Sequence, residues 1–445
     1  MEKLYRLGLR EAAQRIREGA LTAEDLTRAC LTRCSRLEPR IEAWQHLAPG
    51  RALERAEHLD AARSAGSPLG PLHGIALGIK DIIDVAGMPT TMGSPIHAGR
   101  MASTSAPMVE GLEAAGAVIL GKTVTTEFAY YTPNKTKNPW NTAHTPGGSS
   151  MGSAAAVAAG MACGAIGTQT NGSVIRPAAF CGVVGYKPSH GSIPIGGTLA
   201  FAPTFDTVGV FTRSIFDAAW LAAALVAAER RLAPEPAALS RPPRLAAVRS
   251  PVWDAAENAQ KEILAANVAA LRHAGATVSD AELPTSFDDA HAAHRCIMAC
   301  EGARNIGPVQ DRHRDRISAR LNALLDEGAS IPDARYREAL ATQKHLQQEY
   351  ARYLREFDAV VSPPAPGEAP ATLGETGNPA FCTLWTLLGV PAITIPVGLG
   401  PRGMPLGLQI VGGAGHDDEL LSVAAWCERV FPFAGLPGDR EPSGR

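Results

Sequence analysis

The sequence lacks several features that mark common classes of protein. It has no long basic run, and 42 Lys and Arg residues against 44 Asp and Glu residues leave a formal net charge of −2. A row of phosphates would require a basic patch, so nucleic acid is not an expected partner. The eight cysteines form no CxxC pair, which favours a reduced, cytoplasmic chain over a disulfide framework.

Long hydrophobic runs are also missing. The N-terminal stretch MEKLYRLGLREAAQRIREGA is charged throughout and has no apolar segment of a signal peptide. The most apolar segment, residues 153–167, consists largely of Ala and Gly and is too short to span a bilayer. We interpret it as a helix packed inside the protein, and we expect no membrane attachment.

What the chain does contain indicates a large globular enzyme. It has 445 residues, of which 45% are hydrophobic and 19% charged. This favours one large α/β domain or a core with an inserted subdomain. From residue 72 onward, short apolar runs such as GIALGIKDIIDVAG and GAVILGKT alternate with helical patterns. That alternation predicts a β-sheet covered by helices.

The same patterns divide the expected single domain, 1–445, into successive segments. Thr22 and Asp25 resemble a capping box in front of the second N-terminal helix. Further helices are expected near 255–274, over about 286–355 and near 417–430. The expected segments are N-terminal helices (1–65), a catalytic core (66–227), a Pro-rich connector (228–244), an inserted β-α-β and helical region (245–357), a return to the core sheet (358–432) and a loose tail (433–445).

Some motifs fit a familiar pattern in the wrong context. GAVILGKT, residues 116–123, has the letters of a phosphate loop, but its variable positions predict a buried strand. Residues 148–152 fit the G-x-S-x-G turn of α/β-hydrolases, yet no downstream histidine is singled out as a partner. HAAHRCIMAC, residues 291–300, predicts a continuous helix because no other zinc-site spacing completes a metal cluster. We expect neither metal nor cofactor.

The stretch from Thr145 to Gly191 carries two Gly- and Ser-rich loops that we interpret as joined by a small-residue helix. Such loops let backbone N–H groups converge on a substrate oxygen. A serine nucleophile needs a base, and Lys80 lies among apolar neighbours, where burial favours the neutral amine. The residues alone leave a structural alternative open, in which Lys80 pairs with Asp81 or Asp84.

Separated motifs in a fixed order carry a resemblance to a known family. They are GIKDIID, TPGGSSMGSAAAVAAG, GTQTNGSVIRPAAFCGVVGYKPSHG, DTVGVF and LWTLLGVPAITIPVG followed by PLGLQIVG. In these motifs and in the spacing of its two key serines, the sequence resembles the amidase signature family along nearly its whole length. Within that family it is most similar to malonamidase-like members. The resemblance implies an α/β fold with a large mixed β-sheet covered on both faces by helices.

The resemblance also implies roles for individual residues, which would form a Ser-Ser-Lys triad. Ser173 would be the nucleophile, Ser149 the relay serine after a cis Gly148–Ser149 peptide, and Lys80 the base. The resemblance further implies an oxyanion hole and a substrate site. The backbone N–H groups of Thr170, Asn171, Gly172 and Ser173 would form the hole, and Gly148, Met151 and Arg176 would line the site.

The nucleophile loop departs from the usual family pattern. Gln169 stands where most members have Asp, Asn171 replaces a Gly, and Arg176 lies one position later than usual. Because Asn tolerates left-handed torsions, the turn at Asn171 is expected to survive. Arg176 either binds a substrate carboxylate or ties down its own loop through backbone carbonyls. Met151 adds an apolar wall, which suggests a more hydrophobic substrate than malonamate.

The sequence leaves more than one function open. The first is cleavage of the acyl C–N bond of a small amide through an acyl-enzyme on Ser173, by a cytoplasmic monomer or homodimer. A urethanase, which hydrolyses carbamates, and an anilide or ester hydrolase would use the same triad. A second class is the glutaminase subunit of a tRNA-dependent amidotransferase, against which the Arg176 spacing argues. A silent scaffold is the third class, against which the complete triad argues.

Overall fold

The computed structural model describes residues 3–227, 230–433 and 437, and its centre is one 11-stranded sheet. The strands are β1 (Trp44–Leu47), β2 (Ala76–Lys80), β3 (Val118–Thr123), β4 (Gly164–Gln169), β5 (Val184–Lys187), β6 (Thr207–Thr212), β7 (Arg244–Arg249), β8 (Thr277–Glu282), β9 (Ala359–Ser362), β10 (Ala392–Leu399) and β11 (Pro405–Val411). The α-helices are α1 (Leu9–Arg17), α2 (Ala23–Ile41), α3 (Pro49–Ser64), α4 (Pro107–Ala114), α5 (Met151–Ala158), α6 (Ile175–Cys181), α7 (Ile215–Ala223), α8 (Asn258–His273), α9 (Ala290–His313), α10 (Ala319–Ser330), α11 (Asp333–Tyr353), α12 (Ala380–Leu387) and α13 (Asp417–Glu428).

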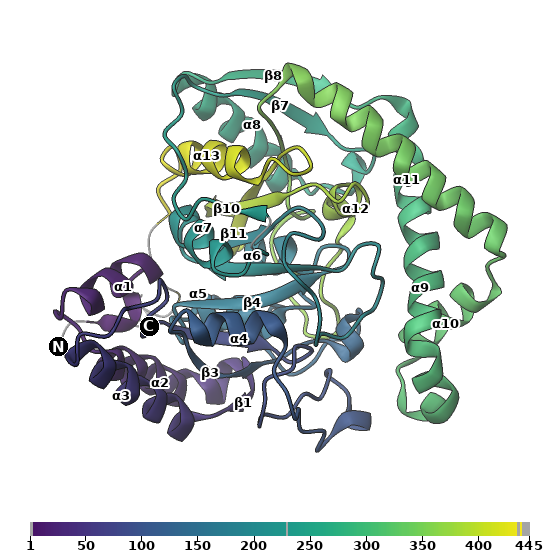
Figure 1. Ribbon diagram of the computed structural model, residues 1–445. Helices are drawn as coiled ribbons and strands as arrows, with labels where there is room; N and C mark the ends of the chain where they lie inside the picture. The colour runs from purple at the N-terminus through teal and green to yellow at the C-terminus, as the bar shows by residue number, and fades with distance from the viewer. Residues whose placement is uncertain (1–2, 228–229, 434–436, 438–445) are drawn as a thin grey trace, which may run out of the picture.

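The sheet is mixed, as expected. Its order is β1-β3-β2-β4-β6-β5-β10-β11-β9-β7-β8. Strand β2 is parallel to both β3 and β4, whereas β5, β6, β10 and β11 pair antiparallel. At the far end, β7 lies parallel to β8 and β9, so the β-α-β unit after the connector extends the same sheet. Helices α9, α10 and α11 stand beside the sheet as a long helical arm (Figure 1).

Helices cover both faces of the sheet because successive strand residues point in opposite directions. On β4, Ala165 packs with apolar residues of α5 and α6, whereas its neighbour Ile166 belongs to the larger cluster that contains α7 and α13. On β6, Phe211 belongs to the cluster with Ala165, and its neighbour Val210 belongs to the cluster with Ile166. Apolar side chains of these central strands therefore pack on both faces of the sheet.

Several local predictions are confirmed. Thr22 caps α2, since its hydroxyl accepts the Asp25 N–H at 2.9 Å. GAVILGKT contains the buried strand β3, and Lys122 from that motif forms a buried ion pair with Asp81 at 3.2 Å. HAAHRCIMAC lies within α9. Helices α8 and α13 lie close to their expected positions.

The prediction for residues 153–167 is wrong in its second half. Helix α5 ends at Ala158, Gly160 turns the chain with a φ of 71°, and β4 begins at Gly164. A run of Ala and Gly gives no periodicity that would separate helix from strand. The two serine loops are therefore joined by a helix and a strand.

Parts of two expected segments lie outside the described residues. These parts are residues 228–229 of the connector and residues 434–436 and 438–445 of the tail. In the portion of the chain that the structure describes, no helix has the length and apolar character needed to cross a membrane.

Candidate active site

The two serine loops meet where β2 and β4 end. These strands are parallel neighbours, with Ile79 opposite Ile166, so their carboxyl ends lie side by side. Lys80 is the last residue of β2, and the loop after β4 leads to Ser173. Ser150 holds the other loop against β4, because its hydroxyl donates to Thr168 O at 3.1 Å and accepts the Thr168 N–H at 3.2 Å.

Lys80 is completely buried and bonds to hydroxyl groups. Its Nζ lies 2.7 Å from Ser149 Oγ and 2.8 Å from Thr168 Oγ1. Burial lowers the pKa of Lys80 to about 7, and the negative charge of Asp206 opposes this shift. A large fraction of the amine is therefore neutral near neutral pH and can accept a proton.

The structure does not pair Lys80 with Asp81 or Asp84, the alternative that the sequence left open. Asp81 pairs with Lys122 at 3.2 Å, on the buried side of β3. Asp84 makes a bidentate pair with Arg100 at 2.7 and 2.8 Å. Both carboxylates that follow Lys80 in the sequence are thus paired with other basic side chains.

Ser149 follows a cis peptide bond, Gly148–Ser149, and Arg176 holds that peptide. Arg176 Nη2 donates to Gly148 O at 2.7 Å, and Nη1 donates to Gly377 O and to Thr376 Oγ1. The side chain is 2% exposed, and among the described residues only its Nε lacks a partner. These contacts correspond to the alternative in which Arg176 ties down a loop through backbone carbonyls. The carbonyls, Gly148 O and Gly377 O, belong to two other loops and not to the loop of Arg176 itself.

Replacing Arg176 with methionine separates its two alternative roles. We expect Arg176→Met to lower the free energy of unfolding by about 3 kcal/mol, because buried carbonyl oxygens lose a charged donor. The rate should fall to a similar extent for neutral amides and for malonamate. Urea unfolding and kinetics on both substrates measure this, and a loss confined to malonamate would instead assign Arg176 to a substrate carboxylate.

The loop before Ser173 is held by side chains on both sides. Gln169 Oε1 accepts the N–H groups of Val174 and Ile175 at 2.8 and 3.0 Å, which gives the unusual Gln a structural role. Thr170 Oγ1 donates to Asp206 Oδ1 at 2.5 Å, and His294 Nε2 lies 3.0 Å from Thr170 O. Burial lowers the pKa of His294 to about 4, so the ring is neutral when it donates this bond.

Asn171 stabilises the loop before Ser173 through its side-chain hydrogen bonds, whereas the sequence suggested tolerance of a left-handed backbone conformation. Its φ is not in the left-handed region, so tolerance of that region is not what the position requires. Instead, Asn171 Nδ2 donates to the Tyr131 hydroxyl at 3.2 Å, and Oδ1 accepts from Thr383 Oγ1 at 2.7 Å. Within the described part of the chain, no acceptor takes the N–H groups of Asn171, Gly172 or Ser173. These groups are available for a substrate oxygen.

A narrow cavity of about 20 Å³ brings most of the expected site residues together. Ser149 and Ser173 line it and are 4% and 8% exposed. The expected residues Thr170, Asn171, Gly172 and Arg176 also line it. The prediction that Met151 forms part of the wall does not match the geometry. Met151 is buried at the start of α5, and neither it nor Gly148 is among the described residues that line the cavity.

The remaining lining residues were missed from the sequence. They are Ala129, Tyr130, Tyr131, Phe201, Met298 and Thr376. Phe128 and Ala129 have φ values of 45° and 59°, which are unusual for residues other than glycine and direct the following tyrosines to the cavity. No sequence pattern indicates this turn. Met298 comes from α9 in the helical arm, far along the chain from the serine loops.

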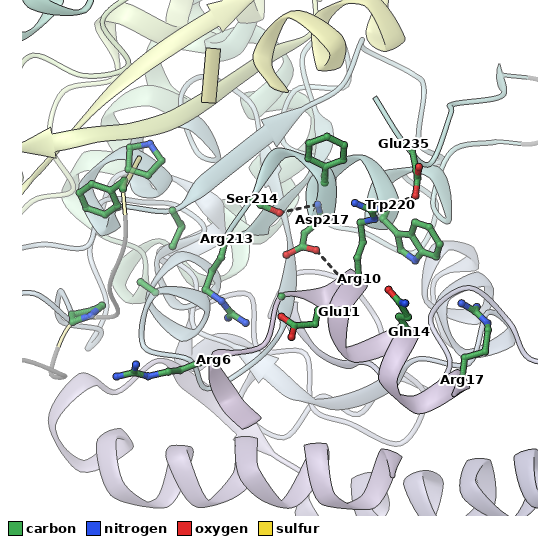
Figure 2. A pocket seen from close by; sticks show the side chains of 18 residues that line it. Arg6, Arg10, Glu11, Gln14, Arg17, Arg213, Ser214, Asp217, Trp220 and Glu235 are labelled. Atoms are coloured by element: carbon green, nitrogen blue, oxygen red, sulfur yellow. Dashed lines mark hydrogen bonds and ion pairs between the residues drawn. The ribbon is translucent and has the colours of Figure 1, made fainter. Parts of the chain in front are cut away.

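A larger cavity of about 810 Å³ lies between α1 and α7 (Figure 2). On its wall the Arg10 side chain pairs with Glu235, and the backbone N–H of Arg10 donates to Asp217 Oδ1 at 2.9 Å. The Asp217 N–H donates to the Ser214 side chain at 3.1 Å. Among the described residues that line it, there is no member of the expected triad, so the narrow cavity is the candidate active site.

Comparison with known proteins identifies the family of the chain. The family model for amidases matches residues 25–421. A glutamyl-tRNA(Gln) amidotransferase subunit from Nitratidesulfovibrio vulgaris (strain DP4) is 33% identical, over 98% of this chain and 99% of that protein. The peptide amidase of Stenotrophomonas maltophilia has a similar structure, with a TM-score of 0.82 and 28% identity over 97% of this chain and 98% of that one. A 6-aminohexanoate cyclic dimer hydrolase superposes with a TM-score of 0.84 and 25% identity, over 98% and 99% of the two chains.

The fold and the relatives define an enzyme that hydrolyses amide bonds. The chain belongs to the amidase signature family. These relatives support the family as a whole and do not single out its malonamidase-like members.

Proposed function

We propose that this amidase cleaves the acyl C–N bond of a small-molecule amide through an acyl-enzyme on Ser173. The observation that carries the proposal is the fully buried Lys80 amine, 2.7 Å from Ser149 Oγ and without a carboxylate partner among the described residues. A lysine in this setting is a proton acceptor, which is what a serine nucleophile requires. No described group of three or more His, Cys, Asp or Glu side chains could hold a metal ion.

The reaction divides into acylation and deacylation. Ser173 Oγ attacks the substrate carbonyl while its proton passes to Ser149 Oγ, and the Ser149 proton passes to Lys80 Nζ. The C–N bond then breaks, and the proton returns by the same route to the leaving nitrogen, which departs as amine or ammonia. Water attacks the ester carbonyl with Lys80 again as base, and Ser173 is released with the carboxylic acid.

The loop from Thr170 to Ser173 supplies the electrostatic part of the mechanism. Its unpaired N–H groups can donate to the oxyanion that develops on the carbonyl oxygen. Each such donor contributes about 3 kcal/mol to lowering the barrier. The bonds from Gln169, Asp206 and His294 hold the loop before the substrate arrives, so no reorganisation is needed during the reaction.

The test is hydrolysis of a panel containing malonamate, an aliphatic amide, an anilide, an aryl carbamate and an ester. With a slowly deacylating substrate, mass spectrometry of the digested protein should find the acyl mass on the peptide that contains Ser173. An acyl mass on the Ser149 peptide, or turnover without any adduct, would contradict the proposed nucleophile. The relative rates also decide among an amidase, a urethanase and an esterase, all of which could use this triad.

A second candidate is the glutaminase subunit of a tRNA-dependent amidotransferase. It is favoured by the amidotransferase subunits among the relatives, which match this chain over nearly its whole length. A stand-alone amidase would be active as a purified monomer or homodimer in the cytoplasm, where we place it. The glutaminase would hydrolyse glutamine, and its activity would rise when it is expressed with the other proteins of its complex. Co-purification from the native cell, followed by a glutaminase assay, separates the two.

A further inference from the structure

Tyr131 occupies a place in the cavity wall that the reaction described above does not use. It follows the turn made by Phe128 and Ala129 and lines the cavity together with Ser149 and Ser173. A backbone turn with positive φ at two successive non-glycine residues is unfavourable and is held in place by the surrounding structure. The Phe128 N–H donates to Met92 O at 2.8 Å, and the Tyr130 N–H donates to Glu127 O at 2.8 Å.

The phenol oxygen of Tyr131 is fixed by Asn171. Thr383 Oγ1 donates to Asn171 Oδ1 at 2.7 Å, which orients the amide so that Nδ2 faces Tyr131. Asn171 Nδ2 then donates to the phenol oxygen at 3.2 Å. In this bond Tyr131 is the acceptor, so its own O–H hydrogen is not consumed.

No acceptor among the described residues takes the Tyr131 hydroxyl proton, and the residue is half-buried in the cavity wall. Burial raises the pKa of Tyr131, while the positive charge of Arg176 acts in the opposite direction. The group therefore stays protonated over the neutral range and keeps its capacity to donate. A ligand that fills the cavity excludes water from this half-buried donor, so the ligand gains affinity when it supplies the acceptor itself.

We propose that Tyr131 is a specificity-determining residue whose hydroxyl donates a hydrogen bond to an acceptor oxygen of the substrate other than the scissile carbonyl. This inference rests on the proposed function, because it places the substrate beside Ser173. It defines a substrate class: amides or carbamates with an ether, carbonyl or carboxylate oxygen within reach of the cavity wall. A hydrocarbon of the same shape leaves the phenol unpaired and binds less well.

Two pairs of substrates test the inference, one for each side of the scissile bond. On the acyl side, methoxyacetyl para-nitroanilide is compared with butyryl para-nitroanilide, in which a CH₂ group replaces the ether oxygen. On the amine side, the butyramide of 2-methoxyethylamine is compared with that of n-butylamine. Tyr131→Phe should lower kcat/KM for the oxygen-containing member of one pair about tenfold more than for its hydrocarbon partner, which loses only the support of the Asn171 side chain.

This additional loss should lie in KM and not in kcat, because the bond to the substrate is present both before and during the reaction. Tyr350→Phe is the matched control. The buried Tyr350 hydroxyl donates to Gly412 O at 3.2 Å, and Tyr350 is not among the described residues that line the cavity, so its removal should affect both members of each pair equally. Equal losses for both members of both pairs in Tyr131→Phe would show that Tyr131 only supports Asn171 and would overturn the inference.

A binding measurement keeps this test separate from that of the proposed function. The dissociation constants of the same four amides are measured by calorimetry for Ser173→Ala and for Ser173→Ala combined with Tyr131→Phe. Weaker binding of one oxygen-containing member alone supports the role of Tyr131 even if Ser173 proves not to be the nucleophile. Unchanged discrimination within both pairs overturns the inference even if the acyl-enzyme on Ser173 is found.

Discussion

Ser173→Ala should abolish turnover, with kcat falling by about 10⁶-fold on any substrate that the wild-type enzyme hydrolyses. The alanine removes the atom that we propose forms the acyl-enzyme, and Ser149 and Lys80 then have no serine nucleophile to deprotonate. Substrate binding should persist, because the loop and its N–H groups are held by Gln169, Asp206 and His294 and not by the Ser173 side chain. Initial rates and calorimetric binding of a slow substrate measure the two effects separately.

Ser153→Ala is the matched control for loss of a buried serine hydroxyl. Ser153 Oγ donates to Ile166 O at 3.0 Å and lies 2.7 Å from Thr123 Oγ1, so it joins α5 to the sheet without lining the cavity. This variant should lose about 1 kcal/mol of stability and keep its kcat. A rate for Ser173→Ala within tenfold of wild type would rule out Ser173 as the nucleophile.

Much of this site could be predicted because its signals are local in sequence. The apolar residues around Lys80 predict a buried strand, and the structure places the whole of β2 in the core. The Gly-rich serine loops indicate close backbone packing, and Ser150 bonds to both the N–H and the carbonyl of Thr168. Periodicity also located α2 and α8, where apolar and polar residues alternate clearly.

The parts that could not be predicted depend on contacts between distant segments. Met298 reaches the cavity from the helical arm, and Tyr130 and Tyr131 reach it through a turn that no glycine marks. Met151 was predicted to line the cavity and does not, because the first residue of a helix beside a serine loop can face either the cavity or the core. Packing of the whole domain decides which, and in the structure Met151 is 1% exposed. Loop geometry of this kind is set by tertiary contacts and not by the amino-acid sequence of the loop itself.

Lys80→Met should lower kcat by about 10⁴-fold and remove the main pH dependence of the reaction. In the wild type, burial lowers the pKa of Lys80 to about 7, and only the neutral amine can accept the Ser149 proton. The value of kcat/KM should therefore rise with pH through about 7 and level off above it. Methionine keeps the length and apolar character of the side chain, so the cavity should retain its shape.

Lys187→Met is the control that isolates the chemistry of Lys80. Burial lowers the pKa of Lys187 to about 8, but its Nζ donates to Val390 O at 2.6 Å and Pro188 O at 3.0 Å, outside the cavity. Its loss should cost about 2 kcal/mol of stability and leave the pH profile unchanged. A rise centred near pH 8 that disappears in Lys187→Met would contradict the assignment of the base. A rise near pH 7 that disappears only in Lys80→Met would assign the base to Lys80, although burial lowers the pKa of both lysines.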